Sequence, residues 1–418
     1  MSEWKEYKLG DLVAINERSI GRNYRYDSIE YIDTSSVTEN KFDEPIYTLI
    51  SEAPSRAKRL ISDGDTIIST VRPIQKHYGF IKKAKENQVV STGFAVVTPK
   101  SIEPRFLYYF LTQAEITEFL NTIAEGGTTT FPAFKSDELK ELSIRIPDLY
   151  TQTAIAGILS SLDDKIELNN KINQELENLA QTLFKQWFID FEFPNENGEP
   201  YKSSGGEMVE SELGEIPKGW VIYSMADLLQ TISKTYPLKS VSEVVFLNTG
   251  DIQDGKFLHS NKSNPKTLPG QAKKSIQKND ILYSEIRPAN KRYAFVHFDS
   301  SKYVVSTKLM VLRSKVPVSS LFQYFILTQS DHINYLQQLA ESRSGTFPQI
   351  TFTEISTIKV VLPSFDKVNQ FVDSVLEPFF NNKFKSESEN TELTNLRDTL
   401  LPKLISGELE VSQTQTNS

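Results

Sequence analysis

The chain carries two copies of one sequence pattern, about 215 residues apart. Arg72-Pro73 in the first copy recurs as Arg287-Pro288 in the second, and Thr130-Phe131-Pro132 recurs as Thr346-Phe347-Pro348. A repeat of this length is too long for a solenoid unit and is the size of a domain. The sequence therefore predicts two copies of one fold, each with the same kind of task.

Each copy has the pattern of a mixed α/β domain. Short runs rich in β-branched residues, such as 66–71, are separated by residues typical of turns. A stretch with an apolar face at helical spacing follows in each copy, at 105–124 and at 320–340. Loops rich in glycine and hydroxyl residues, 125–129 and 341–345, then lead to the repeated Thr-Phe-Pro.

A long helix is predicted after each copy. In 152–190, apolar residues recur at alternating three- and four-residue steps, and no proline or glycine follows Gly157. Pro378 and Pro402 should kink or end the second helix. The two helices are predicted to pack antiparallel through Leu162, Ile166, Leu176, Leu179, Leu183, Leu393, Leu396 and Leu400. The predicted fold class is mixed α/β, with two repeated α/β domains separated by two long antiparallel helices that form a coiled-coil spacer.

Charge is distributed unevenly around a net value of -8. Basic residues outnumber acidic ones in 56–85 and again in 256–315, which are equivalent places in the two copies. Acidic residues gather in 191–218 and after Ser364. Each copy therefore has a basic centre of the kind that suits a nucleic-acid partner, although the whole chain is acidic.

Composition excludes several classes of protein. The sequence has 0 cysteines, which excludes disulfides and thiolate metal sites and suits a reducing cytoplasm. We find no apolar run near the roughly 20 residues of a membrane span, and the first residues lack the apolar core of a signal peptide. We therefore expect a cytoplasmic protein with no membrane partner.

Catalytic motifs are not found. The sequence has no Pro-Pro dipeptide of an adenine methyltransferase loop, no Gly-x-Gly-x-x-Gly after a strand and no phosphate-binding Gly-x-x-x-x-Gly-Lys. The histidines are not at the spacing of metal ligands. The paired carboxylates Asp163-Asp164 are interpreted as a solvated helix face or a cap-like interaction. We therefore expect no catalytic residue and no metal site.

Several phrases resemble the DNA-specificity subunit of type I restriction-modification systems. Lys8-Leu9-Gly10-Asp11 and the segment 212–220 resemble the starts of its recognition domains. The segment 162–188 resembles its central conserved region, and 396–407 its C-terminal one. The second copy departs from the pattern in having Ala226-Asp227 in place of Gly-Asp.

The resemblance implies an order of domains along the whole chain. Target recognition domain 1 occupies 1–150 and is followed by the central conserved helix, 151–192, and a linker, 193–219. Target recognition domain 2 occupies 220–363. The C-terminal conserved helical region occupies 364–411, and 412–418 is a disordered tail.

The resemblance also implies function and partners. Such a subunit is not an enzyme: it reads a bipartite, asymmetric site on double-stranded DNA and scaffolds two methyltransferase subunits and the restriction subunits. Its helices would set the distance between the half-sites. No cofactor is expected in this chain, because S-adenosylmethionine, ATP and Mg²⁺ belong to the partners. The alternative is a two-domain helical scaffold that binds protein partners only, which leaves the paired basic centres unexplained.

Side chains in the basic centres and the glycine- and hydroxyl-rich loops are the candidates for DNA contact, because phosphate and base edges take cationic, amide and hydroxyl groups. They are Arg72, Lys76, His77, Tyr78, Gly127, Thr128, Thr129, Arg287, Asn290, Lys291, Arg292, Tyr293, Ser342, Arg343 and Ser344.

Overall fold

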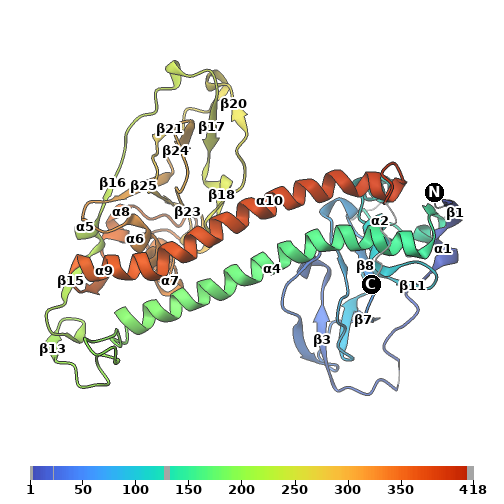
Figure 1. Ribbon diagram of the computed structural model, residues 1–418, viewed down its shortest axis with the longest axis horizontal. Helices are drawn as coiled ribbons and strands as arrows, with labels where there is room; N and C mark the ends of the chain where they lie inside the picture. The colour runs from blue at the N-terminus through green and yellow to red at the C-terminus, as the bar shows by residue number, and fades with distance from the viewer. Residues whose placement is uncertain (1–2, 22, 127–131, 412–418) are drawn as a thin grey trace, which may run out of the picture. The chain divides into compact units, whose positions relative to one another are not determined.

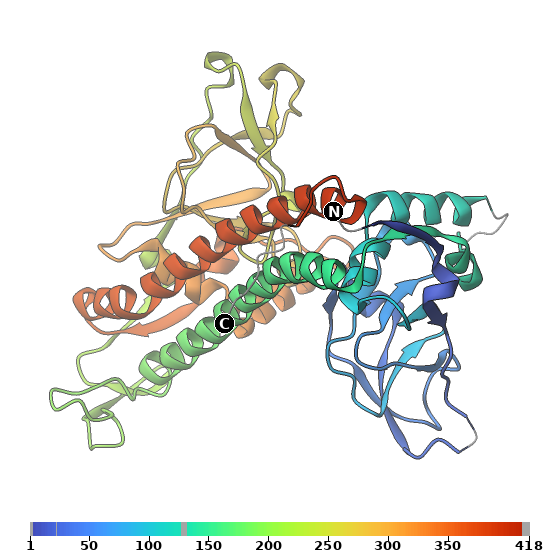
Figure 2. The ribbon, with the colours of Figure 1, turned by 45° about the vertical axis from the view of Figure 1, so that its right-hand side comes forward.

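The computed structural model describes residues 3–21, 23–126 and 132–411, so the predicted tail lies outside the described residues. The chain divides into two compact units, one of residues 1–170 with 387–418 and the other of residues 171–386. Each unit contains one copy of the repeat together with parts of both long helices. The ribbon is shown in Figures 1 and 2.

The first unit has two four-stranded sheets. One is antiparallel, in the order β2 (Val13–Ile15), β11 (Phe94–Pro99), β8 (Thr66–Ser69) and β9 (Tyr78–Phe80). The other has the order β6 (Ile46–Leu49), β3 (Ser28–Ile32), β10 (Gln88–Ser91) and β7 (Ala57–Leu60), with β3 and β10 parallel. Two short antiparallel pairs complete it, β1 (Lys5–Lys8) with β12 (Ser143–Ile146) and β4 (Val37–Thr38) with β5 (Lys41–Phe42).

The second unit repeats this topology. Its sheets have the orders β16 (Leu229–Thr231), β25 (Leu309–Ser314), β22 (Ile281–Ser284), β23 (Tyr293–Phe295), and β20 (Lys262–Ser263), β17 (Val244–Leu247), β24 (Tyr303–Ser306), β21 (Ala272–Ser275). Its short pairs are β15 (Val221–Ser224) with β26 (Lys359–Leu362) and β18 (Ile252–Gln253) with β19 (Lys256–Phe257). A further hairpin, β13 (Met208–Ser211) with β14 (Gly214–Pro217), lies in the segment predicted as a linker. The prediction of two copies of one mixed α/β fold is confirmed.

Helices cover the sheets at equivalent places. The first unit has α1 (Leu9–Leu12), α2 (Pro104–Leu111), α3 (Ala114–Glu125) and the 3₁₀ turns η1 (Thr34–Ser36), η2 (Pro73–Gln75) and η3 (Ser136–Glu141). The second has α5 (Met225–Leu228), α6 (Ser320–Leu327), α7 (Ser330–Arg343), α8 (Phe352–Ser356), α9 (Phe365–Phe371) and the turns η4 (Leu238–Ser240), η5 (Thr249–Asp251), η6 (Pro265–Thr267) and η7 (Pro288–Asn290). The single helix predicted in each copy is therefore two, because the chain turns at Thr112 and again at Thr328.

The long helices are α4 (Leu149–Phe188), of 40 residues, and α10 (Glu377–Ser406), which follows a π-helical turn, η8 (Val372–Leu376). Of the two predicted effects of Pro402, a kink or an end, the second does not occur, since α10 continues through it to Ser406. Pro378 lies at the second residue of α10, directly after the π-helical turn.

Within each unit the parts of these helices run antiparallel (Figures 1 and 2). In the first unit Asp163 contacts Arg397, and Asn169 donates to Asn390 across 2.8 Å. A later residue of α4 thus contacts an earlier residue of α10, as antiparallel helices require. In the second unit Asn382 donates to Asn173 across 3.4 Å, and the rings of Trp187 and Phe371 are 5.1 Å apart.

Both long helices contribute to the hydrophobic core of each copy. In the first unit Phe106 and Leu107 of α2 pack with Ile155 and Leu159 of α4 and with Leu404 of α10. In the second, α6 packs in the same way against aromatic side chains of α4, α9 and α10, among them Phe184, Phe188, Phe371 and Phe380. In each copy, residues of the long helices are thus part of the hydrophobic core of the domain.

A fully buried aspartate lies at the same place in each copy, Asp65 and Asp280. Arg18 donates to Asp65 across 2.8 Å, whereas Arg313 donates to Asp280 through two bonds of 2.7 and 3.0 Å. The partners come from different places in the fold, although the aspartates are equivalent: Arg18 lies in the loop after β2, and Arg313 belongs to β25. A buried carboxylate needs such a partner because its desolvation is costly.

Arg313→Met should therefore destabilise the second copy. Removing one partner of a buried ion pair leaves the other charge unpaired, and we expect a loss of about 3 kcal/mol in the free energy of unfolding. Differential scanning calorimetry or denaturant unfolding measures it. The exposed Lys315, two residues along the chain, offers a matched control in Lys315→Met, which should change stability by less than about 0.5 kcal/mol. Equal effects of the two substitutions would contradict a special role for the buried pair.

Candidate nucleic-acid interface

The same strained turn follows β8 and β22. Arg72 has φ 47° and Lys76 has φ 55°, both in the left-handed region, on either side of η2. Arg287 and Lys291, on either side of η7, have φ 45° and 52°. Left-handed backbone is uncommon outside glycine, asparagine and aspartate, and costs of order 1–3 kcal/mol for each such residue. Four basic residues with this conformation, at equivalent positions, point to a function that needs the shape.

The surrounding backbone holds the turn in place. The Arg72 N–H donates to the Pro132 carbonyl across 2.9 Å, and the Arg287 N–H donates to the Pro348 carbonyl across 3.1 Å. At the other end, the N–H of each lysine donates to the carbonyl of the buried proline three residues before it. The turn is therefore tied in each copy to the proline of the repeated Thr-Phe-Pro sequence.

The side chains at the tip differ between the copies. Ile74 is 56% exposed and Gln75 is also exposed. Their equivalents are Ala289, which is exposed, and Asn290, which is half-buried. One rigid backbone thus carries two different sets of tip residues between the same basic flanks. The exposed Ile74 and Gln75 were missed as site residues, although their place between repeated residues was the available signal.

The flanking cations project to solvent. Arg72, Lys76, Arg287 and Lys291 are all exposed. Lys76 pairs with Glu39 across 2.8 Å, and a nitrogen of the Arg287 guanidinium lies 3.4 Å from the Thr346 carbonyl. These contacts are at the surface, where solvent competes with them. The cations can therefore exchange them for contacts with an anionic partner.

The tyrosines of the predicted site are framework residues. Tyr293 is buried and its hydroxyl donates to Asp254 across 2.7 Å, so the prediction that it contacts DNA was wrong. Tyr78 is half-buried against Tyr108, and this burial raises the pKa of Tyr78 to about 12. The Nδ1 atom of His77 lies 2.7 Å from the Val37 carbonyl, which orients the ring. Arg292, the equivalent of His77, is half-buried.

The second predicted loop is partly helical. Ser342 and Arg343 belong to the last turn of α7, and Arg343 pairs with Glu354 of α8, so these two residues do not lie in a loop as predicted. Ser344 follows the helix and its hydroxyl accepts a bond from the Phe347 N–H. Phe347 itself is 72% exposed and is a further candidate that the sequence reasoning missed. Gly127, Thr128 and Thr129 lie outside the described residues.

Part of the basic centre of the first copy serves the fold. Lys85 pairs with Glu30 across 2.7 Å, and Lys82 pairs with Asp164 of α4 across 2.8 Å. The interpretation of Asp163-Asp164 as a solvated face or cap was therefore incomplete: Asp164 is exposed, but Asp163 is half-buried. These carboxylates accept bonds from Lys82, Arg105, Tyr109 and Arg397.

The predicted leucine seam is only partly buried. Leu162, Ile166, Leu176, Leu183, Leu393 and Leu400 are half-buried. Leu179 and Leu396, which are equivalent in the repeat, are 53% and 47% exposed, so they do not pack between the helices as predicted. The apolar spacing was right for a helix but did not reveal which of its residues face another helix.

Within residues 3–21, 23–126 and 132–411, no three histidine, cysteine, aspartate or glutamate side chains are grouped as a metal ion would require. No helix in the same ranges combines the length and the apolar composition needed to cross a membrane.

Comparisons with known proteins agree with this architecture. The family model of the type I restriction modification DNA specificity domain matches residues 1–178 and 217–395, once for each copy. The chain is 31% identical to the type I restriction enzyme HindI specificity subunit of Haemophilus influenzae, over 98% of this chain and 100% of that protein. It is 28% identical to the MjaIX specificity subunit of Methanocaldococcus jannaschii, over 98% of this chain and 89% of that protein.

A solved structure has the same fold. It is the type I restriction-modification S subunit of M. genitalium, at a TM-score of 0.54 and 14% identity, covering 99% of this chain and 97% of that one. With the family model matched in both copies, the chain belongs to the DNA specificity subunits of type I restriction-modification systems.

Proposed function

We propose that the chain reads a bipartite, asymmetric DNA site for a type I restriction-modification complex, one half-site with each copy of the repeat. The observation that carries this is the duplicated turn, in which identical strained backbone and basic flanks surround different tip residues. Cations suit the phosphate backbone, whereas base edges are read by shape, hydrogen bonds and apolar contact. A reading element needs both parts.

The tip residues suggest how the half-sites differ. An amide such as that of Gln75 or Asn290 can make two bonds to adenine, and an apolar side chain such as Ile74 can contact the thymine methyl group. Ile74-Gln75 and Ala289-Asn290 differ in length and in apolar surface. The two copies therefore select different bases.

The recognised site should accordingly be non-palindromic. The recognised sequence is determined by sequencing the methylated adenines in a host with and without this chain. We expect a methylated motif of two unlike half-sites, present only with the chain. A palindromic motif would contradict the assignment of one half-site to each copy.

The catalytic work belongs to partners. We propose that two methyltransferase subunits bind the chain and supply S-adenosylmethionine, and that restriction subunits supply the chemistry that uses ATP and Mg²⁺. The long helices α4 and α10 would then form a coiled-coil spacer that sets the distance between the half-sites. This assignment gives the chain no catalytic residue, places the complex in the cytoplasm and takes 1–150 and 220–363 as the recognition domains.

Electrophoretic mobility shift tests the proposal directly. With methyltransferase subunits present, the complex should bind a duplex that carries the methylated motif and should bind a scrambled duplex at least about 1,000-fold more weakly. A chain that assembles with the subunits but does not change their DNA preference would be a protein-only scaffold instead.

A further inference from the structure

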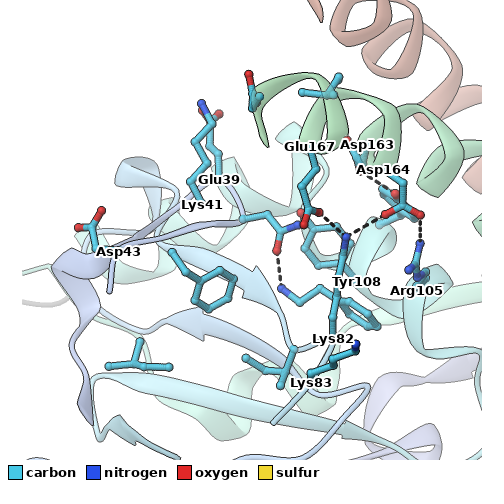
Figure 3. A pocket seen from close by; sticks show the side chains of 18 of the residues that line it. Glu39, Lys41, Asp43, Lys82, Lys83, Arg105, Tyr108, Asp163, Asp164 and Glu167 are labelled. Atoms are coloured by element: carbon cyan, nitrogen blue, oxygen red, sulfur yellow. Dashed lines mark hydrogen bonds and ion pairs between the residues drawn. The ribbon is translucent and has the colours of Figure 1, made fainter. Parts of the chain in front are cut away.

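The first recognition domain is attached to α4 through ion pairs. Lys82, in the loop after β9, places its ammonium nitrogen 2.8 Å from Asp164 and 2.5 Å from Glu167. Arg105 of α2 donates to the other oxygen of Asp164 across 3.2 Å. Figure 3 shows these side chains converging from the recognition domain and from the helix.

The neighbouring carboxylate joins three helices. The Tyr109 hydroxyl of α2 donates to one oxygen of Asp163 across 2.6 Å, and Arg397 of α10 donates to the other across 2.7 Å. Arg397 also donates to Asp398. Asp163 therefore ties the recognition domain to both long helices, within one unit of the chain.

These side chains line a cavity of about 810 Å³. Burial alone would raise the pKa of Asp164, but the bonds from Lys82 and Arg105 lower it overall. Burial and the charge of Asp163 raise the pKa of Tyr109, so its hydroxyl remains a donor.

The same contact in the second unit is aromatic. His297 stacks on Phe384, with ring centroids 3.6 Å apart and an interplanar angle of 6°. The ring of Phe380 lies 5.7 Å from Tyr324 of α6. The repeat gives the equivalent positions: Lys82 corresponds to His297, and Glu167 corresponds to Phe384. Tyr109 corresponds to Phe325, Asp163 to Phe380, and Arg397 to Ala180.

Burial confirms the contrast. Phe325, Phe380 and Ala180 are buried, whereas Lys82 and Asp164 are partly exposed. Burial also lowers the pKa of His297, so its ring stacks without a charge at neutral pH. Ions screen partly exposed charges over a distance of about 10 Å at 0.1 M salt, and they do not weaken apolar packing.

We propose that Asp163 and Asp164 are positioning residues that add ionic contacts to the apolar packing of the first recognition domain on the helices, while the equivalent contacts of the second domain are aromatic. The inference rests on the proposed function, because its consequence is in DNA reading. We expect the preference for the correct sequence over a scrambled one to depend on salt at the first half-site and not at the second.

The measurement is a ratio of affinities, made with the complex of this chain and its methyltransferase subunits. The Kd for a duplex with one half-site scrambled is divided by the Kd for the full site. Phosphate contacts carry no sequence information, so their salt dependence largely cancels in this ratio. The ratio is determined separately for each half-site, from about 50 to 300 mM NaCl, a range in which phosphate contacts alone change Kd greatly.

For the unaltered chain we expect the ratio of the first half-site to decline at least about threefold more over this range than that of the second, a difference of about 0.7 kcal/mol. Equal salt dependence of the two ratios would overturn the inference.

Asp163→Asn/Asp164→Asn should lower the ratio of the first half-site about tenfold at low salt, the effect of about one mismatched base pair, and leave that of the second within twofold. The conservative Asp164→Glu should retain most of the ratio that Asp164→Asn loses, because it keeps the charge.

Glu175→Gln removes an exposed carboxylate from the same helix and should change neither ratio. Loss of both ratios together, or of neither, in the double variant would contradict positioning by charge. If the unaltered complex prefers no DNA site, the proposed function itself fails, which separates the two outcomes.

Hydrogen exchange gives a second readout without any substitution. Amides of 81–86 should exchange several-fold faster at high salt, while those of the equivalent 296–301 should not change. Faster exchange in both segments would also overturn the inference.

Discussion

Replacing Arg287 and Lys291 together by alanine should weaken binding to the methylated motif by at least about 100-fold, if each makes a charge-assisted bond worth about 1.5–3 kcal/mol. The slope of log Kd against log salt should decline by about 1.8, because each phosphate contact contributes about 0.9. Assembly with the methyltransferase subunits should be unchanged. Both side chains are exposed and lie on either side of the turn.

Alanine is the appropriate replacement at these positions. It keeps the Cβ atom, so the strained left-handed backbone at Arg287 and Lys291 is neither relieved nor made worse. Lys302→Ala/Lys315→Ala is a matched control, since it removes two exposed cations of the same copy away from the turn. A lowered melting temperature with an unchanged salt slope would make Arg287 a framework residue, like the buried Pro288 beside it.

The frame of this site was predictable from the sequence, but its shape was not. The repeat of Arg72-Pro73 as Arg287-Pro288 marked the turn, because two copies that diverge elsewhere had kept it. Nothing in these residue types predicts a left-handed backbone at arginine, a conformation that hydrogen bonds to Pro132 and Pro348 hold. Those bonds join residues about 60 positions apart.

The orientation of side chains was also beyond the sequence. Tyr293 looked like part of a basic surface because it adjoins Arg292, yet alternate residues of a strand face opposite sides and its side chain is buried. Asp163-Asp164 looked solvated because helix periodicity shows only one apolar face. Their partners Lys82, Arg105 and Arg397 are distant in sequence, so only the tertiary structure brings them together.

Lengthening the two long helices together should change the spacing of the half-sites without changing their sequences. The test inserts four residues between Ile172 and Leu183 of α4 and four between Asn382 and Leu393 of α10. Four helical residues add about 6 Å, and a base pair rises about 3.4 Å along each strand. We therefore expect methylated motifs with the same half-sites and one or two more base pairs between them.

The expected change in spacing requires α4 to be continuous. Its 40 residues contain no internal proline, and residues of the one helix belong to both compact units of the chain. A helix resists stretching because each added residue extends its hydrogen-bonded ladder by a fixed rise. Inserted residues must therefore lengthen α4 by a set amount instead of forming slack.

A longer insertion and an insertion elsewhere sharpen the test. Seven residues in each helix add about 10.5 Å, or about three base pairs, and turn the apolar seam by only about 20°. Four residues inserted between Asn197 and Gly198, in an exposed turn after α4, lengthen the chain but not the helix and should leave the spacing as it was. Methylation at the original spacing by both helix variants would show that the distance between half-sites is set by something other than α4 and α10.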